Sequence, residues 1–332
     1  MRLVQLISGR SRRLAVVEEP HLVPLLGFDT TYALAWDSIR SGEPITTLVE
    51  KIRTNERLDY DAIYAGRSEW KLLPPIDHAF DPSRCIVSGT GLTHLGSAAD
   101  RQAMHEKSET ELTDSMKIFR WGLESGRPAP GEIGVAPEWF HKGNALMMRG
   151  PNDPLIVPAF SEDGGEEAEI AAACIIGPDG RPFRVGMAPG NEFSDHRFEK
   201  RNYLNLAGSK LRTFSLGPEL TLDPDFQSVP GTVRIERGGK ELWSRTIATG
   251  EKEMCHSLRN IEHHHFKFPL HRRPGDVHVH FLGAVALSFG SGIALENGDV
   301  MEVRFDGFGR ALRNPLEVET GPQTLIEVQP LA

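Results

Sequence analysis

The chain has 332 residues, of which 39% are hydrophobic and 25% charged, the composition of an ordinary globular protein. This length allows one large domain or two smaller ones with a substantial buried core. A formal net charge of −9 argues against a nucleic-acid-binding surface, but it neither indicates nor excludes an acidic substrate.

Cysteine spacing and the N-terminal segment bear on the compartment. Cys85, Cys174 and Cys255 are far apart and form no CxxC or CxxCH spacing, which fits a reducing compartment and offers no thiolate zinc site. The N-terminal segment lacks the cleavage site of a signal peptide, and no apolar run is long enough to span a membrane. We therefore expect a cytoplasmic protein without membrane or nucleic-acid partners.

Residues 1–80 are predicted to form a small N-terminal α/β domain. Segments 2–7 and 14–19 flank a basic turn and predict a hairpin, whereas 30–42 and 44–55 have the apolar spacing of helices. The proline-punctuated segment 70–84 is interpreted as a linker.

Residues 81–332 predict a second, mostly β domain, so the fold class is α+β. A strand at 85–91 is followed by a polar, helical segment at 95–126 that could act as a flexible cap. The later pattern predicts strands joined by short glycine-containing turns, at 167–193, 231–247, 275–287, 298–309 and 310–319.

Two glutamates in GEEAEIAAACIIG (165–177) carry the first chemical signal. If this stretch is a strand, Glu167 and Glu169 project from the same face, where two carboxylates repel and resist dehydration. A bland alternative is an edge strand whose acids face water. A hard cation such as magnesium, manganese or calcium would instead relieve the repulsion. Glu192 and Asp195, just past the next strand, are the candidates for a third ligand.

Lys210 and a histidine-rich segment offer further candidates. A lysine is most often a solvated surface charge, but beside three carboxylates Lys210 could anchor an anionic substrate or transfer a proton. On the assumption of a strand, adjacent rings in the HHH stretch (263–265) point in opposite directions and cannot share an ion. For the seven histidines between 256 and 280 we expect packing or an oligomer interface rather than a metal site.

Other catalytic motifs are incomplete or missing. GTGLTH (89–94) matches half of a dinucleotide-binding fingerprint but lacks its third glycine and its βαβ context. The chain contains no Walker motif and no GxSxG elbow. The residues therefore favour a metal-assisted site without an organic cofactor.

Seven segments, in order between residues 84 and 317, resemble motifs of the fumarylacetoacetate hydrolase superfamily. EEAEIAAACIIG is similar to its E-x-E-L metal strand, and GNEFSDH to its N-D-x-S-x-R-D segment. The other similar segments are GTGLTHLGSAAD, PEWFHKGN, KLRTFSLGPEL, RPGDVHVHFLGA and ENGDVMEVRFDGFGRALRN.

This resemblance implies a mixed β-sheet roll of the superfamily's C-terminal type, a homodimer, and Mg²⁺ or Mn²⁺ on three carboxylates. Carried over by position, the metal ligands are Glu167, Glu169 and Glu192, the last replacing the usual aspartate. Lys210 falls on the active-site lysine, and Lys142 lies in the PEWFHKGN segment. The resemblance thus implies that the substrate is a small 2-keto acid.

Two departures from the superfamily pattern bear on the reaction. Hydrolase members activate water with a histidine and a glutamate three residues apart, where this chain has Ser97 and Asp100. Serine is no base near neutral pH, which argues against hydrolysis. Residues 281–283 replace a T-G-T motif, so that a hydroxyl contact to substrate is missing.

Within the superfamily the chain is most similar to the branch that dehydrates 2-keto-3-deoxy sugar acids. This implies conversion of a 2-keto-3-deoxypentonate (2-keto-3-deoxyarabonate type) to α-ketoglutarate semialdehyde in pentose catabolism. Lys210 or a nearby carboxylate would take the C3 proton. The acid for the leaving hydroxyl is sought among Asp100, Thr93 and His94, whereas Lys210, Ser97 and Lys142 are predicted to bind substrate. The alternatives are a metal-dependent C–C hydrolase of an acylpyruvate or diketo acid, and a non-catalytic sugar-acid-binding protein.

Overall fold

The computed structural model describes residues 1–94 and 113–331. Ser97 and Asp100 therefore lie outside the described residues. Strands predominate among the described elements and form two sheets, one of 13 strands and one of five. Both sheets contain parallel as well as antiparallel pairs, which confirms the predicted α+β, mostly β class with mixed sheets.

The N-terminal strands form the hairpin predicted from the sequence, with Leu3 opposite Val16. Thr30 accepts a hydrogen bond from the backbone N–H of Ala33 and so begins the first helix, which Gly42 ends in a left-handed conformation. The elements are β1 (Arg2–Ser8), β2 (Ser11–Glu18), β3 (His21–Pro24), α1 (Thr31–Ser41), α2 (Ile45–Ile52), β4 (Leu58–Asp59), α3 (Tyr60–Tyr64) and β5 (Lys71–Leu72).

The remaining strands of the large sheet continue directly from the N-terminal ones. The main order is β4-β3-β2-β1-β13-β11-β10-β16-β6-β7, with β5, β8 and β12 attached at its sides. The bounds are β6 (Cys85–Gly89), β7 (Phe140–Asn144), β8 (Met148–Arg149), β10 (Ala168–Ile176), β11 (Pro182–Asn191), β12 (Phe214–Leu216), β13 (Leu220–Thr221) and β16 (Val277–Phe281).

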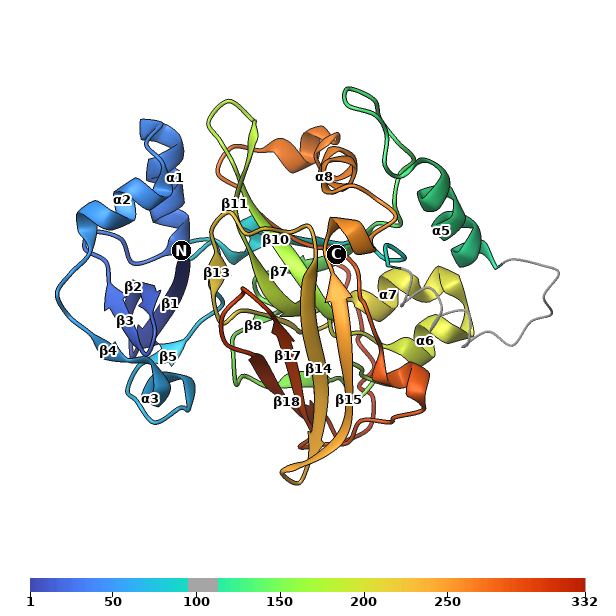
Figure 1. Ribbon diagram of the computed structural model, residues 1–332. Helices are drawn as coiled ribbons and strands as arrows, with labels where there is room; N and C mark the ends of the chain where they lie inside the picture. The colour runs from blue at the N-terminus through green and yellow to red at the C-terminus, as the bar shows by residue number, and fades with distance from the viewer. Residues whose placement is uncertain (95–112, 332) are drawn as a thin grey trace.

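One hydrophobic core spans the proposed boundary between the domains. Leu3 and Val16 from the N-terminal hairpin belong to the same buried cluster as Ala171 and Phe281. Figure 1 shows α1, α2 and α3 with their strands on one side of the molecule, and α5, α6 and α7 on the other. The division between residues 80 and 81 stays a prediction, but sheet and core are continuous across it.

The small sheet packs against the large one and closes the roll. Ile170 and Ala172 on β10 share a second buried cluster with Val233 and Val303 of the small sheet. Because both faces of β10 are covered, its run of alanines and isoleucines is buried throughout. The small sheet has the order β15-β14-β17-β18-β9, with β9 (Leu155–Val157), β14 (Val229–Arg237), β15 (Lys240–Thr249), β17 (Val300–Phe305) and β18 (Leu312–Val318).

The later helices frame the sheets. They are α5 (Asp114–Ser125), α6 (His196–Arg201), α7 (Leu206–Lys210) and α8 (Leu258–Phe266), with short 3₁₀ turns at Pro82–Arg84, Tyr203–Asn205, Glu251–Glu253, Pro269–Arg272 and Ser288–Ser291. The HHH stretch lies in α8, so the assumption of a strand was wrong. Ser257 caps this helix by accepting from the N–H of Asn260, and His265 points inward while His263 is exposed.

The expected packing role of the histidines is confirmed for four of them. His265 lies within 5.0 Å, centroid to centroid, of the rings of His271, His278 and His280. These four rings, here called the histidine cluster, are buried between α8, the turn after it and β16.

Candidate functional site

The three predicted metal ligands meet where β10 begins and β11 ends. Ala168 pairs with Asn191 in this antiparallel ladder, and the backbone N–H of Glu192 donates to the carbonyl of Glu167 at 2.9 Å. One carboxylate oxygen from each of Glu167, Glu169 and Glu192 lies within 4.8 Å of the other two. All three side chains are buried, so the bland reading of water-facing acids does not apply.

Two buried lysines neutralise part of this charge. Lys210 Nζ lies 2.6 Å from Oε1 of Glu167 and 2.8 Å from Oε2 of Glu192, and it sits over the ring of Phe140. Lys142 Nζ lies 2.6 Å from Oε1 of Glu192. Both lysines predicted from the sequence therefore contact the carboxylates directly, Lys210 from the end of α7 and Lys142 from β7.

A histidine that was not identified from the sequence also contacts the carboxylates. His196, the first residue of α6, places Nε2 at 3.0 Å from Oε1 of Glu167. The same oxygen accepts a hydrogen bond from Lys210 Nζ, so two donors hold one oxygen of the Glu167 carboxylate. A histidine that orients a ligating carboxylate is a common supporting element of metal sites.

The proton affinities of the three carboxylates diverge. Burial and the charges of Glu192 and Glu167 raise the pKa of Glu169 well above its usual range. Burial alone would also raise the pKa of Glu167, but Lys210 and His196 outweigh it and hold that pKa well below its usual range. Three acids in one buried place thus remain compatible because their environments differ.

The two lysines also differ. Burial lowers the pKa of Lys142 to about 8, despite its pairing with Glu192. Burial would lower the pKa of Lys210 too, but Glu167 and Glu192 raise it above its ordinary value. Lys210 is therefore an ammonium between two carboxylates in this structure and is suited to holding a negative charge.

Asp195, the other candidate for third ligand, is engaged elsewhere. Its Oδ1 accepts the N–H of Phe198 and caps α6, while its Oδ2 accepts from Arg212 at 3.2 Å and from the N–H of Glu162. It is not in the carboxylate group. Of the two candidates, Glu192 is therefore the one whose carboxylate converges with those of Glu167 and Glu169.

Thr93 and His94 form a buried chain behind the site. The Thr93 hydroxyl donates to the carbonyl of Leu282 and lies 2.9 Å from Nδ1 of His94, whose Nε2 lies 2.9 Å from Thr249. Burial lowers the pKa of His94 to about 3, so its ring is neutral near neutral pH. Their predicted role as acids stays a prediction, while their contacts support the segment after β16.

That segment supplies a backbone donor to the site. The N–H of Gly283 donates to Oε2 of Glu169 at 2.8 Å. Gly283 has φ of +108°, and an added Cβ would lie 1.8 Å from Thr93 Oγ1, so no larger residue fits. The replacement of T-G-T therefore leaves a backbone contact to a carboxylate in place of a hydroxyl.

Glu138 is the second residue that was missed. It is buried, and the hydroxyl of Tyr203 donates to its Oε1 at 2.6 Å. Glu138 packs closely on the backbone, since an added Cβ on Gly91 would lie 1.6 Å from its Oε2. Phe140 lies against Gly89 in the same way, and the ammonium of Lys210 sits over its ring.

The residues fit a hard divalent cation. Oxygen atoms alone make up the convergent donor set, in which three buried carboxylates meet two lysines. Mg²⁺ and Mn²⁺ favour such ligands. Glu167, Glu169 and Glu192 would hold the ion, with His196 and Gly283 orienting two of them. Among the residues described, this is the one group of three or more acids, histidines or cysteines with convergent ligand atoms.

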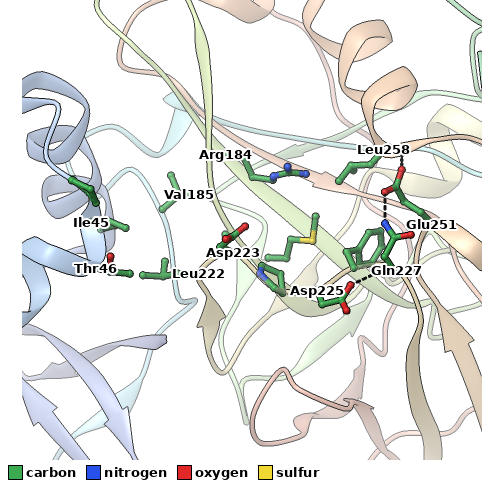
Figure 2. A pocket seen from close by; sticks show the side chains of 15 residues that line it. Ile45, Thr46, Arg184, Val185, Leu222, Asp223, Asp225, Gln227, Glu251 and Leu258 are labelled. Carbon is green, nitrogen blue, oxygen red and sulfur yellow. Dashed lines mark hydrogen bonds between the residues drawn. The ribbon is translucent and has the colours of Figure 1, made fainter. Parts of the chain in front are cut away.

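A well-formed pocket of about 570 Å³ lies elsewhere, between α2 and the start of the large sheet's β11 (Figure 2). Two of its polar side chains bond to other residues that line it: Gln227 donates to Glu251, and Glu251 accepts the N–H of Leu258 at the start of α8. None of the three convergent carboxylates lines it. The chemistry therefore points to the carboxylates rather than to this pocket.

The chain matches no protein-family model and no curated protein. It does match solved structures along nearly its whole length. One is 2-keto-3-deoxy-D-arabinonate dehydratase complexed with magnesium and 2,5-dioxopentanoate, with 16% identity, a TM-score of 0.71, and coverage of 97% of this chain and 100% of that chain. The apo form of that dehydratase gives 17% identity, the same TM-score and the same coverage.

This chain has the dehydratase fold. A less similar match is 5-carboxymethyl-2-hydroxymuconate delta-isomerase from Mycobacterium smegmatis, with 17% identity, a TM-score of 0.58, and coverage of 96% of this chain and 100% of that chain. The fold implied by the resemblance to the fumarylacetoacetate hydrolase superfamily is thereby confirmed. In the described ranges, no helix has both the length and the apolar character that crossing a membrane requires.

Proposed function

We propose that the chain is a divalent-metal-dependent dehydratase that converts a 2-keto-3-deoxypentonate to α-ketoglutarate semialdehyde. The observation that carries the proposal is the buried group of Glu167, Glu169 and Glu192, whose ligand atoms lie within 4.8 Å of one another. The match to a dehydratase complexed with magnesium and 2,5-dioxopentanoate supports it, because 2,5-dioxopentanoate is the same compound as this semialdehyde.

A divalent ion at this site would act as a Lewis acid on a 2-keto acid and acidify the protons at C3. Lys210, held as an ammonium by Glu167 and Glu192, would stabilise negative charge that develops on the substrate. Lys142 secures Glu192 from the other side and keeps that carboxylate in place.

We propose Glu138, besides Lys210, as the group that takes the C3 proton. Glu138 is a buried carboxylate next to Phe140, which packs on Lys210, and the Tyr203 hydroxyl fixes its orientation. A positioned carboxylate is suited to general-base work.

Loss of the C3 proton and of the C4 hydroxyl removes one molecule of water and leaves an unsaturated keto acid. Its isomerisation, with transfer of hydrogen from C5, gives the semialdehyde without any oxidant. The proton for the leaving hydroxyl remains assigned by prediction to Asp100, Thr93 or His94. Substrate binding by Ser97, a homodimer, a cytoplasmic location and a place in pentose catabolism likewise stay predictions.

The test is an assay of the metal-stripped protein with Mg²⁺ or Mn²⁺ restored, against a panel of 2-keto-3-deoxy acids and acylpyruvates. We expect metal-dependent formation of an aldehyde, which Glu167→Gln should lose. The control variant Glu262→Gln should retain it, because Glu262 on α8 pairs with Arg184 of β11 and is not one of the convergent carboxylates. Full activity of Glu167→Gln with excess EDTA would refute the proposal. Pyruvate as product would indicate the C–C hydrolase, and ligand binding without turnover the sugar-acid-binding protein.

The role of Glu138 has a separate test. Glu138→Gln keeps the shape of the side chain but removes the base, so we expect kcat to fall by roughly 10²- to 10⁴-fold. Metal affinity should not change, because Glu138 is outside the carboxylate group. An unchanged kcat would exclude Glu138 as the base.

A further inference from the structure

One buried segment, from Gly283 to Phe289, is tied to the acidic stretch GEEAE at two points. At its start, the N–H of Gly283 donates to Glu169 Oε2 at 2.8 Å. Near its end, Ser288 donates twice to Glu166: its N–H to Oε1 and its Oγ to Oε2, both at 2.7 Å. Glu166 is fully buried, and both of its oxygens are engaged by this one serine.

Glu166 is not one of the convergent carboxylates, although it precedes Glu167 directly. Neighbouring residues in extended chain point to opposite sides, so Glu167 faces the lysines while Glu166 faces the segment after β16. A buried carboxylate is retained at low cost only when its oxygens are hydrogen-bonded, and Ser288 meets that requirement.

The tied segment contacts Glu169 directly and reaches Glu167 through one intervening residue, His196. Gly283 holds Glu169 directly. Phe289, the residue after Ser288, packs its ring 5.3 Å from that of His196, and His196 Nε2 lies 3.0 Å from Glu167 Oε1. A shift of this segment would therefore move the partners of both carboxylates together.

We propose that Glu166 is a positioning residue that sets the affinity of the site for its divalent ion by fixing the segment Gly283–Phe289 through Ser288. This rests on the proposed function only in that the ion site itself is part of that proposal. Direct hydrogen-bond partners of metal ligands change metal affinity by about 10- to 100-fold in other metal sites, and Glu166 acts on two such partners through Ser288.

The experiment measures the dissociation constants of Mn²⁺ and Mg²⁺ by titration calorimetry on the full chain, with the melting temperature in EDTA recorded beside them. Glu166→Ala removes both hydrogen bonds and should weaken binding by about tenfold or more. Ser288→Ala removes one and should weaken it less. Glu166→Gln should stay near the wild type, because an amide can accept the Ser288 N–H and donate to its Oγ. Glu262→Ala is the control and should bind as the wild type does.

Two results would overturn the proposal. One is a wild-type dissociation constant in Glu166→Ala together with a lower melting temperature, which would make Glu166 a structural residue only. The other is an unchanged dissociation constant in Ser288→Ala, which is the deciding measurement when Glu166→Ala does not fold. A wild-type protein that binds the ion but dehydrates no keto acid would refute the dehydratase and leave this role standing, whereas a wild-type protein that binds no ion would overturn both.

Discussion

The histidine cluster makes the stability of the fold sensitive to acid. Burial, followed by the neighbouring rings, lowers the pKa of His278 and of His280 to about 3, and the same causes lower the pKa of His265. Throughout the described part of the chain, the charged neighbours that shift these three pKa values are other histidines and no carboxylate. Burial and the neighbouring rings therefore both oppose protonation of these histidines in the folded state.

The magnitude follows from proton linkage. A histidine whose folded pKa lies below its ordinary 6.5 takes up its proton on unfolding, so it contributes stability above that value and loses it as the pH falls. Between about pH 7 and about pH 5 the loss is about 2 kcal/mol for one such ring. Because about pH 5 is well above the folded value, the ring stays neutral in the folded protein over this whole range.

We therefore expect His280→Gln to flatten the pH dependence of stability by about 2 kcal/mol over this range. The free energy of unfolding is measured by urea titration in EDTA for the wild type and the variant at both ends of the range. His263→Gln, an exposed position on α8, is the matched control. Carboxylates outside the histidine cluster are the same in all three proteins, so their effect cancels. Equal losses in wild type and His280→Gln would refute a neutral, buried ring.

Three further predictions concern other buried polar groups. Lys142→Met leaves the carboxylates with one ammonium fewer and should cost about 3 kcal/mol in EDTA, with a larger gain in melting temperature on adding Mg²⁺ than in wild type. Gly91→Ala adds a methyl that displaces the end of Glu138, so kcat should fall while metal affinity holds. Tyr60→Phe removes the hydroxyl that donates to buried Glu219 at 2.8 Å and should cost about 1–2 kcal/mol in urea unfolding.

The strand pattern made much of the fold predictable. Alternation and turn residues located the N-terminal hairpin, the pair β10–β11 and the pair β14–β15. The alternation rule also placed Glu167 and Glu169 on one face, and the hairpin geometry brought Glu192 to them. These features depend on residues close in sequence, where local geometry decides which side chains meet.

Features that depend on distant segments were not accessible in the same way. Lys142 and Lys210 come from β7 and α7, and only the resemblance linked them to the carboxylates before the structure showed the contacts. His196 was passed over although it follows Asp195, because its role depends on where α6 begins. The HHH stretch misled because three identical polar residues carry no period, whereas the cap at Ser257 marks a helix.

The stretch GEEAE shows why counting acids is a poor guide to a site. Its three glutamates occupy consecutive or alternate positions, yet extended backbone divides them between two tasks. Glu167 and Glu169 converge with Glu192, whereas Glu166 turns away and accepts both donors of Ser288. The segment held by Glu166 also holds Glu169 through Gly283 and packs Phe289 on His196, the partner of Glu167. Substitution at position 166 is thus expected to act on the ion without touching it.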